Sequence, residues 1–181
     1  MTSFDLDFAH QDHFALLGLP RRYALDRGEL DRLFLEVQGR VHPDKHAHLS
    51  DADRRLAMQW STQVNDAYQT LTDPQRRARY LLQLAGHDPR IETNTVMPTE
   101  FLLEQMDLRE TVAEARESGD IDRLDALHRR LRQEILAQQE VLRQTLDESQ
   151  DHARAGEVVR QMMFQEKLLT EIDEALAAIE G

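Results

Sequence analysis

The sequence predicts an all-α protein with two helical domains. Only 7 glycines and 5 prolines interrupt its 181 residues, which leaves long stretches free to form helices. Within those stretches apolar residues recur at the spacing of an amphipathic helix. Residues 87–97 lack this spacing, and prolines lie within and next to them, so we interpret them as a linker. We therefore expect domains over residues 1–86 and 98–181.

The predicted helices of the N-terminal domain have recognisable start and stop signals. A short helix over residues 12–17 runs into a Gly-Leu-Pro sequence, which stops helices. Asp26 stands three residues before Glu29 and forms a capping box with it, so a second helix begins there. This helix ends at the loop that contains Pro43. Two further helices begin at Ser50 with Asp53 and at Asp73-Pro74.

The C-terminal domain is predicted to be a bundle of three long helices. Amphipathic segments lie near residues 98–117, 120–147 and 152–180, and short polar turns separate them. Three long helices joined by short turns pack most simply in an up-down-up arrangement. We therefore expect a three-helix bundle here.

Composition excludes several classes of function. The chain has no cysteine, which rules out disulfides, thiolate nucleophiles and cysteine-ligated clusters held by this chain alone. No signal peptide and no apolar run long enough for a membrane span is visible, so we expect a cytoplasmic protein without membrane contact. We expect no catalytic centre, resident metal or cofactor.

The net charge of −12 is unevenly divided along the chain. Residues 1–90 carry 12 Lys and Arg against 13 Asp and Glu, whereas residues 91–181 carry 10 against 21. Nucleic-acid phosphates would be repelled by so acidic a C-terminal half, so we expect no nucleic-acid partner. This acidity favours a basic protein partner, although solubility alone also explains it.

A His-Pro-Asp sequence separates the second and third predicted helices. His42, Pro43 and Asp44 are followed at once by Lys45. Because proline fixes its own backbone and disfavours helix at the preceding residue, the chain must turn here. The turn presents an imidazole and a carboxylate at the end of a helical hairpin. An Arg side chain of a partner protein could donate charge-assisted hydrogen bonds to such a carboxylate.

This arrangement resembles the J-domain, the module that docks on DnaK-type heat-shock ATPases and stimulates ATP hydrolysis. The likeness covers roughly residues 12–85 and is carried by residues 14–20, 42–45 and 65–71. It implies that the ATPase is bound by the His-Pro-Asp loop and the preceding helix. The residues that match are His42, Pro43, Asp44, Lys45, Arg32 and Arg40.

The likeness extends into the second half of the chain. Residues 80–82 and 99–110, together with the bundle, resemble co-chaperones of the HscB type. Such proteins bind the IscU-type scaffold on which iron–sulfur clusters are assembled and deliver it to a specialised, HscA-type DnaK-like ATPase. The N-terminal cysteine-rich metal module of some eukaryotic relatives is missing, so the resemblance is to the bacterial form.

The second helix departs from many J-domains in its charge. Beyond its first turn it offers only Arg32 and Arg40 as cations, mixed with Asp31 and Glu36, where many J-domains are strongly basic. This difference favours a dedicated ATPase partner over a general DnaK-type chaperone.

The first bundle helix has more apolar residues than a core stripe needs. On a helical wheel Leu108, Val112 and Ala115 cluster with Phe101 and make a sufficient stripe. Leu102, Leu103 and Met106 fall outside it, near acidic side chains, and this predicts a partner site. The family resemblance assigns scaffold binding to these residues and to others nearby: Leu102, Leu103, Met106 and Phe164, with Asp107, Glu110 and Glu114.

The last helix supplies the fourth apolar member of this site. We expect its core stripe to consist of Val158, Met162, Leu169, Ile172, Leu176 and Ile179. Phe164 lies at the margin of that stripe, where an aromatic side chain can anchor a partner, and Met163 lies nearly opposite it. The alternative is that the bundle buries all these residues in its core.

Two other functions remain open. A general J-domain co-chaperone for unfolded clients would share the His-Pro-Asp loop, although the expected Gly/Phe-rich linker and β-rich peptide-binding domain are missing. A metal site could form from His42, His46 and His48 with Asp44, but no distant ligand stands out to complete it.

Overall fold

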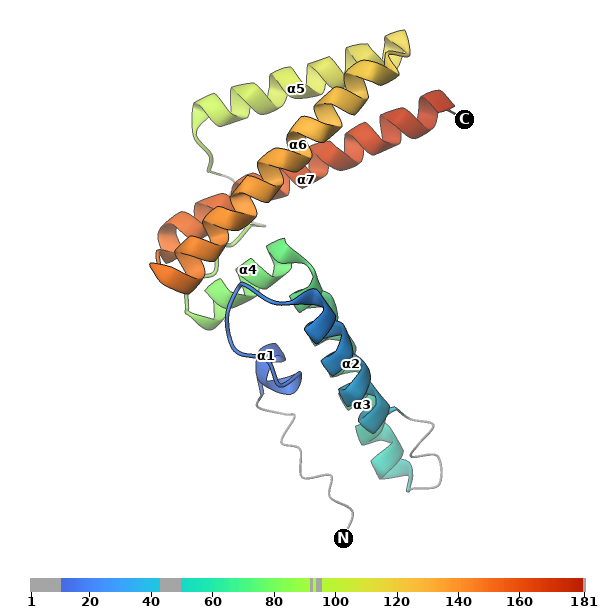
Figure 1. Ribbon diagram of the computed structural model, residues 1–181, viewed down its shortest axis with the longest axis vertical. Helices are drawn as coiled ribbons and strands as arrows, with labels where there is room; N and C mark the ends of the chain where they lie inside the picture. Colours follow the sequence, from blue (N-terminus) through green and yellow to red (C-terminus); the bar gives the residue numbers. More distant parts are fainter. Residues whose placement is uncertain (1–10, 43–49, 92, 94–95, 181) are drawn as a thin grey trace. The chain divides into compact units, whose positions relative to one another are not determined.

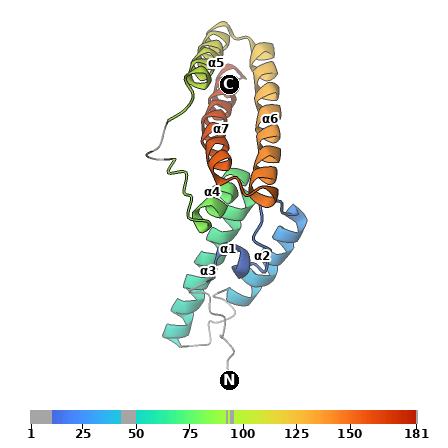
Figure 2. The same cartoon turned by 90° about the vertical axis from the view of Figure 1, so that its left-hand side faces the viewer.

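The computed structural model describes residues 11–42, 50–91, 93 and 96–180, and Figures 1 and 2 show it as ribbons. Helices, turns and loops account for all of these residues, and no strand occurs among them. The predicted all-α class is therefore confirmed. The chain divides into two compact units, Met1–Leu81 and Leu82–Gly181. The domain limits expected from the sequence, with a linker at residues 87–97, stay a prediction.

Local capping explains where the helices of the first unit begin. Asp12 caps the short helix α1 (His13–Leu16), and its Oδ1 accepts from the Ala15 N–H at 2.9 Å. Asp26 and Ser50 cap α2 (Arg27–Val41) and α3 (Asp51–Thr72) in the same way, as the sequence predicted. Helix α4 (Pro74–Leu84) begins at its proline, where the missing N–H costs nothing.

Helices α2 and α3 lie side by side as a hairpin (Figures 1 and 2). Phe34 of α2 stacks on Tyr68 of α3, with ring centroids 4.0 Å apart. The Tyr68 hydroxyl donates to Asp31 Oδ1 at 2.8 Å. Apolar side chains from both helices fill the space between them and are almost fully buried: Leu30, Val41, Ala57, Trp60, Val64, Ala67 and Leu71.

His13 connects α1 to α4 within the same unit. Its ring stacks on Tyr80 at 4.3 Å, and its backbone N–H donates to the Tyr80 hydroxyl at 3.0 Å. Burial lowers the pKa of His13, and the carboxylates of Asp66 and Asp12 only partly oppose this shift. The neutral imidazole is therefore the form that the fold favours.

The second unit contains the three long helices that the sequence predicted: α5 (Thr99–Ser118), α6 (Ile121–Arg143) and α7 (His152–Glu180). Gly119 ends α5 with φ +69°, a conformation that favours glycine. Helices α5 and α7 run in the same direction, because Phe101 contacts Phe164 and Arg109 pairs with Glu171. Helix α6 runs opposite to both.

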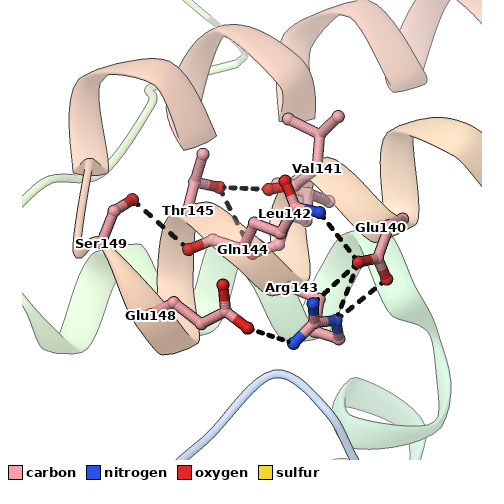
Figure 3. Close-up of polar contacts among 8 residues, drawn as sticks. All are labelled: Glu140, Val141, Leu142, Arg143, Gln144, Thr145, Glu148 and Ser149. Carbon is pink, nitrogen blue, oxygen red and sulfur yellow. Dashed lines mark hydrogen bonds and ion pairs between the residues drawn. The ribbon is translucent and has the colours of Figure 1, made fainter.

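One π-helical turn, η3 (Gln144–Glu148), continues α6, and no sequence pattern predicted it. Figure 3 shows the polar contacts around it. The Thr145 hydroxyl donates to the Val141 carbonyl at 2.8 Å, a back-bond that competes with regular helical pairing. Arg143 binds Glu140 and Glu148, at 2.8 Å and 2.7 Å. Hydrogen bonds from Arg143, above all to Glu140, raise its pKa.

The predicted core stripe of α7 is wrong in part. Val158, Met162 and Ile172 are buried as expected, but Leu169, Leu176 and Ile179 are only half-buried. The stripe is rotated toward residues that the wheel left out: Ala155, Val159, Gln165, Leu168 and Ala175. Because α7 carries apolar residues around much of its circumference, periodicity alone did not fix which side faces α5 and α6.

Candidate partner-binding sites

The first candidate site is the end of the α2–α3 hairpin. His42 caps the C-terminus of α2 with φ −61° and ψ 128°, so the last helical residue is Val41, two residues before Pro43. This is the extended conformation that a following proline favours. The His42 side chain is exposed. Pro43, Asp44 and Lys45 lie outside the described residues, so their predicted role stays a prediction.

Two of the three arginines of α2 share one carboxylate. Arg32 and Arg40 are both exposed, and a guanidinium nitrogen of each lies 3.8 Å from a Glu36 oxygen. These contacts with Glu36 are long and solvated, so each contributes little. Both guanidinium groups lie on the exposed surface of α2, and the negative charge of Glu36 partly offsets their positive charge.

The second candidate site is an apolar patch on α5. Leu103 is 60% exposed and Met106 is 67% exposed, whereas Leu102 is half-buried. Leucine and methionine three residues apart share one side of a helix, so the two exposed side chains are neighbours. The expectation that Leu103 and Met106 stay outside the core is confirmed. Their part in binding stays a prediction.

Phe164 joins this patch from α7. It is half-buried, and its ring meets Phe101 edge-on with centroids 6.0 Å apart. Such a pair fixes the orientation of Phe164. Phe101, which the sequence placed in the core stripe, is itself only half-buried. The four apolar residues predicted for the site thus divide into two exposed and two half-buried side chains.

Carboxylates border the apolar patch on α5. Asp107 and Glu110 are exposed and make no ion pair within the described part of the chain. Glu114 is also exposed, and it pairs with Arg123 of α6 at 3.3 Å. The edge of the patch therefore carries uncompensated negative charge, which suits a basic partner.

Helix α5 also buries a polar side chain that apolar periodicity did not reveal. Gln105 is 3% exposed, and its Oε1 has no hydrogen-bond partner. It follows Phe101 by four residues and so belongs to the same helical side. Gln165 of α7 is likewise 5% exposed with an unpartnered Oε1. Wheel position alone could have placed both glutamines in the core.

Neither a metal site nor a membrane-spanning helix is found in the described part of the structure. No group of three or more metal-ligating side chains occurs there. Of the histidines proposed as an alternative metal site, His46 and His48 lie outside it, as does Asp44. Each helix that the structure describes is too short or too polar to cross a bilayer.

Comparisons with known proteins match each half of the chain. The family model for the DnaJ domain matches residues 12–80, and the model for the HSCB C-terminal oligomerisation domain matches residues 97–173. A helical hairpin ending at His-Pro-Asp and joined to a helical bundle thus defines a J-domain co-chaperone.

Relatives over the whole chain identify the family. The chain is 49% identical to a co-chaperone protein HscB homolog of Aromatoleum aromaticum, over 94% of this chain and 96% of the relative. An HscB homolog of Ralstonia nicotianae is 47% identical, over 94% and 97% respectively. The chain therefore belongs to the HscB family of co-chaperones.

Solved structures agree with this assignment. Chaperone HscB from Vibrio cholerae superposes with a TM-score of 0.80 at 35% identity, over 91% of this chain and 96% of that one. Human co-chaperone protein HscB gives a TM-score of 0.85 at 27% identity, over 91% and 82%.

Proposed function

We propose that this co-chaperone binds an IscU-type iron–sulfur cluster scaffold protein, delivers it to an HscA-type DnaK-like ATPase and stimulates ATP hydrolysis. The scaffold would lie on Leu102, Leu103, Met106 and Phe164, with Asp107, Glu110 and Glu114 at the border. The ATPase would meet His42, Pro43, Asp44, Lys45, Arg32 and Arg40. No catalytic residue belongs to the chain itself.

The observation that carries the proposal is the exposure of Leu103 and Met106 beside Asp107 and Glu110. When a partner covers large apolar side chains that are more than half exposed, apolar area is removed from water, and this favours binding. Carboxylates without an ion pair add attraction to a cationic partner and steer its approach. The patch therefore has the composition of a binding surface rather than of a solvated helix side.

The α2–α3 hairpin supports the other half of the proposal. The two helices are tied together by the Phe34–Tyr68 stack and by buried apolar residues, so the hairpin presents its end on a rigid frame. His42 is exposed where α2 stops. The following Asp44 would accept hydrogen bonds from an Arg of the ATPase.

Both activities are tested together with three purified proteins. ATP hydrolysis by the DnaK-like ATPase is measured alone, with the co-chaperone, and with co-chaperone plus scaffold. We expect a rate increase on the first addition and a further increase on the second. An unfolded client protein in place of the scaffold should give no further increase. Absence of any stimulation by the co-chaperone would refute the proposal.

A further inference from the structure

A hollow lies between α5 and α7 beyond the apolar patch. Its volume is about 460 Å³, within the range of sites that hold a ligand group. Val112 and Ala175, both buried, line it. Ala113, which is exposed, lies at its mouth. The other lining residues are charged: Arg109, Arg116, Glu117, Glu171 and Glu174.

The hollow is continuous with the patch along α5. Ala113 follows Met106 by seven residues, two helical turns, and so lies on the same side of the helix about 10 Å further along. The Arg109–Glu171 ion pair, with Nε and Oε2 3.2 Å apart, lines the hollow and joins α5 to α7. Arg109 follows Met106 by three residues, so the hollow begins one helical turn beyond the patch.

The rim of the hollow carries charges that the bundle does not neutralise. Arg116, Glu117 and Glu174 line it and are exposed, and none of them makes an ion pair with another described residue. The charges of Arg109 and Glu171 cancel each other. The two glutamates and one arginine that remain give the rim a net charge of one negative unit. It therefore suits an apolar group that has a cationic neighbour.

The size of the patch shows that a bound partner must extend past it. Leu102, Leu103 and Met106 cover little more than one turn of α5, whereas a stable interface buries about 800 Å² per partner, roughly 30 Å across. Helix α5 begins at Thr99, only three residues before Leu102. Along α5, helical surface therefore continues from the patch only toward Ala113 and Glu117, while Phe164 extends the patch sideways onto α7.

We propose that the hollow between α5 and α7 is a second contact point for the scaffold protein, taking one of its apolar side chains next to a Lys or Arg. This inference rests on the proposed function, since the partner is the scaffold bound at the patch. The hollow would add affinity and fix the orientation of the scaffold along α5.

Filling the hollow tests the inference. In Ala113→Phe a ring occupies the mouth, while Leu103 and Met106 are untouched. Ala137→Phe, at an exposed position of α6, is the matched control. Affinity for purified IscU-type scaffold is measured by calorimetry, and the melting temperature of each variant is recorded. We expect Ala113→Phe to weaken binding by about tenfold, and Ala137→Phe to stay within about twofold of the unsubstituted chain.

A second variant keeps the test decisive if Ala113→Phe does not fold. Glu174→Lys reverses an unpaired charge at the rim, and Asp125→Lys makes the same change on α6, away from the hollow. We expect Glu174→Lys to weaken scaffold binding by about fivefold at low salt and Asp125→Lys to change it by less than about twofold.

The double variant Leu103→Ala/Met106→Ala separates this inference from the proposed function. If it weakens binding while Ala113→Phe and Glu174→Lys bind normally, the hollow is no contact point and the patch still is. If all three bind normally, the scaffold does not bind this face, and both proposals fail.

Discussion

The two units of the chain present their candidate sites in opposite ways. In the first unit the site is the end of a hairpin, where α2 stops at His42 and the nearby Arg32 and Arg40 share Glu36. In the second unit the site is the side of a continuous helix, where Leu103 and Met106 are exposed beside unpaired carboxylates. The first site depends on a few polar atoms, and the second depends on the apolar area that a partner can cover.

This difference has consequences for substitution. A site made of a few charge-assisted hydrogen bonds should fail when a single atom is changed. A site made of apolar area should lose affinity in steps, one side chain at a time. The exposed members of the two sites, such as His42, Leu103 and Met106, contribute little to the buried cores, so changes to them should leave the melting temperature almost unaltered.

The largest effect is expected on stability, from a substitution inside the bundle. It serves as the reference for substitutions in the exposed patch. Leu131 of α6 is 1% exposed, so Leu131→Ala should leave a cavity and lower the free energy of unfolding by about 2–5 kcal/mol. Leu103→Ala, on the exposed side of α5, should change it by less than about 0.5 kcal/mol. Urea denaturation followed by circular dichroism measures both, and equal losses would show that Leu103 belongs to the core.

The next effect concerns the hairpin end. Asp44→Asn keeps the size of the side chain but removes its charge, and His42→Gln removes the imidazole. We expect either change to abolish ATPase stimulation, because a lost charge-assisted hydrogen bond costs about 1.5–3 kcal/mol. Scaffold affinity should be unchanged in both variants. Stimulation at the original level by either one would show that the loop is not the contact.

A smaller effect is expected at the patch. Met106→Ala should weaken scaffold binding by about 1–2 kcal/mol, roughly five- to thirtyfold. Phe164→Ala should do the same and also lower stability, since it breaks the edge-on contact with Phe101. Calorimetric titration with the scaffold gives the affinities. If Met106→Ala lowers the melting temperature but not the affinity, the side chain has a structural role only.

The smallest expected effect is a pH dependence of the stability of the first unit. The pKa of His13 is lowered in the folded chain, so below about pH 6.5 the unfolded chain binds a proton that the folded chain does not. Stability should therefore fall as the pH drops through this value. His13→Gln should flatten the change in unfolding free energy between about pH 7.5 and 5.5. An identical pH profile in the variant would contradict this assignment.

Local chemistry made much of the first unit predictable from sequence. Caps such as Asp26 and Ser50 act on backbone groups two or three residues away, so the helix starts can be found without any tertiary information. The effect of Pro43 on the residue before it is local in the same sense. The sequence therefore placed the end of α2 correctly, just before Pro43.

The second unit was less predictable from sequence. The errors in its prediction concern which side of a helix is buried. The wheel placed Leu103 and Met106 outside the core correctly, since polar residues border them on α5. It misplaced the stripe of α7, where apolar residues surround much of the helix, and it ignored Gln105 and Gln165. The π turn at Thr145 depends on a side-chain hydrogen bond that no periodicity predicts.

The central claim is that one molecule couples the two partners through its two units. It is tested by mixing Asp44→Asn, which should bind scaffold but not stimulate the ATPase, with Leu103→Ala/Met106→Ala, which should do the reverse. Scaffold-dependent ATP hydrolysis is measured for each variant, for the mixture and for the unsubstituted chain. We predict that the mixture stays at the level of the separate variants, far below the unsubstituted chain. Full activity of the mixture would show that the two sites need not belong to one molecule and would contradict the account.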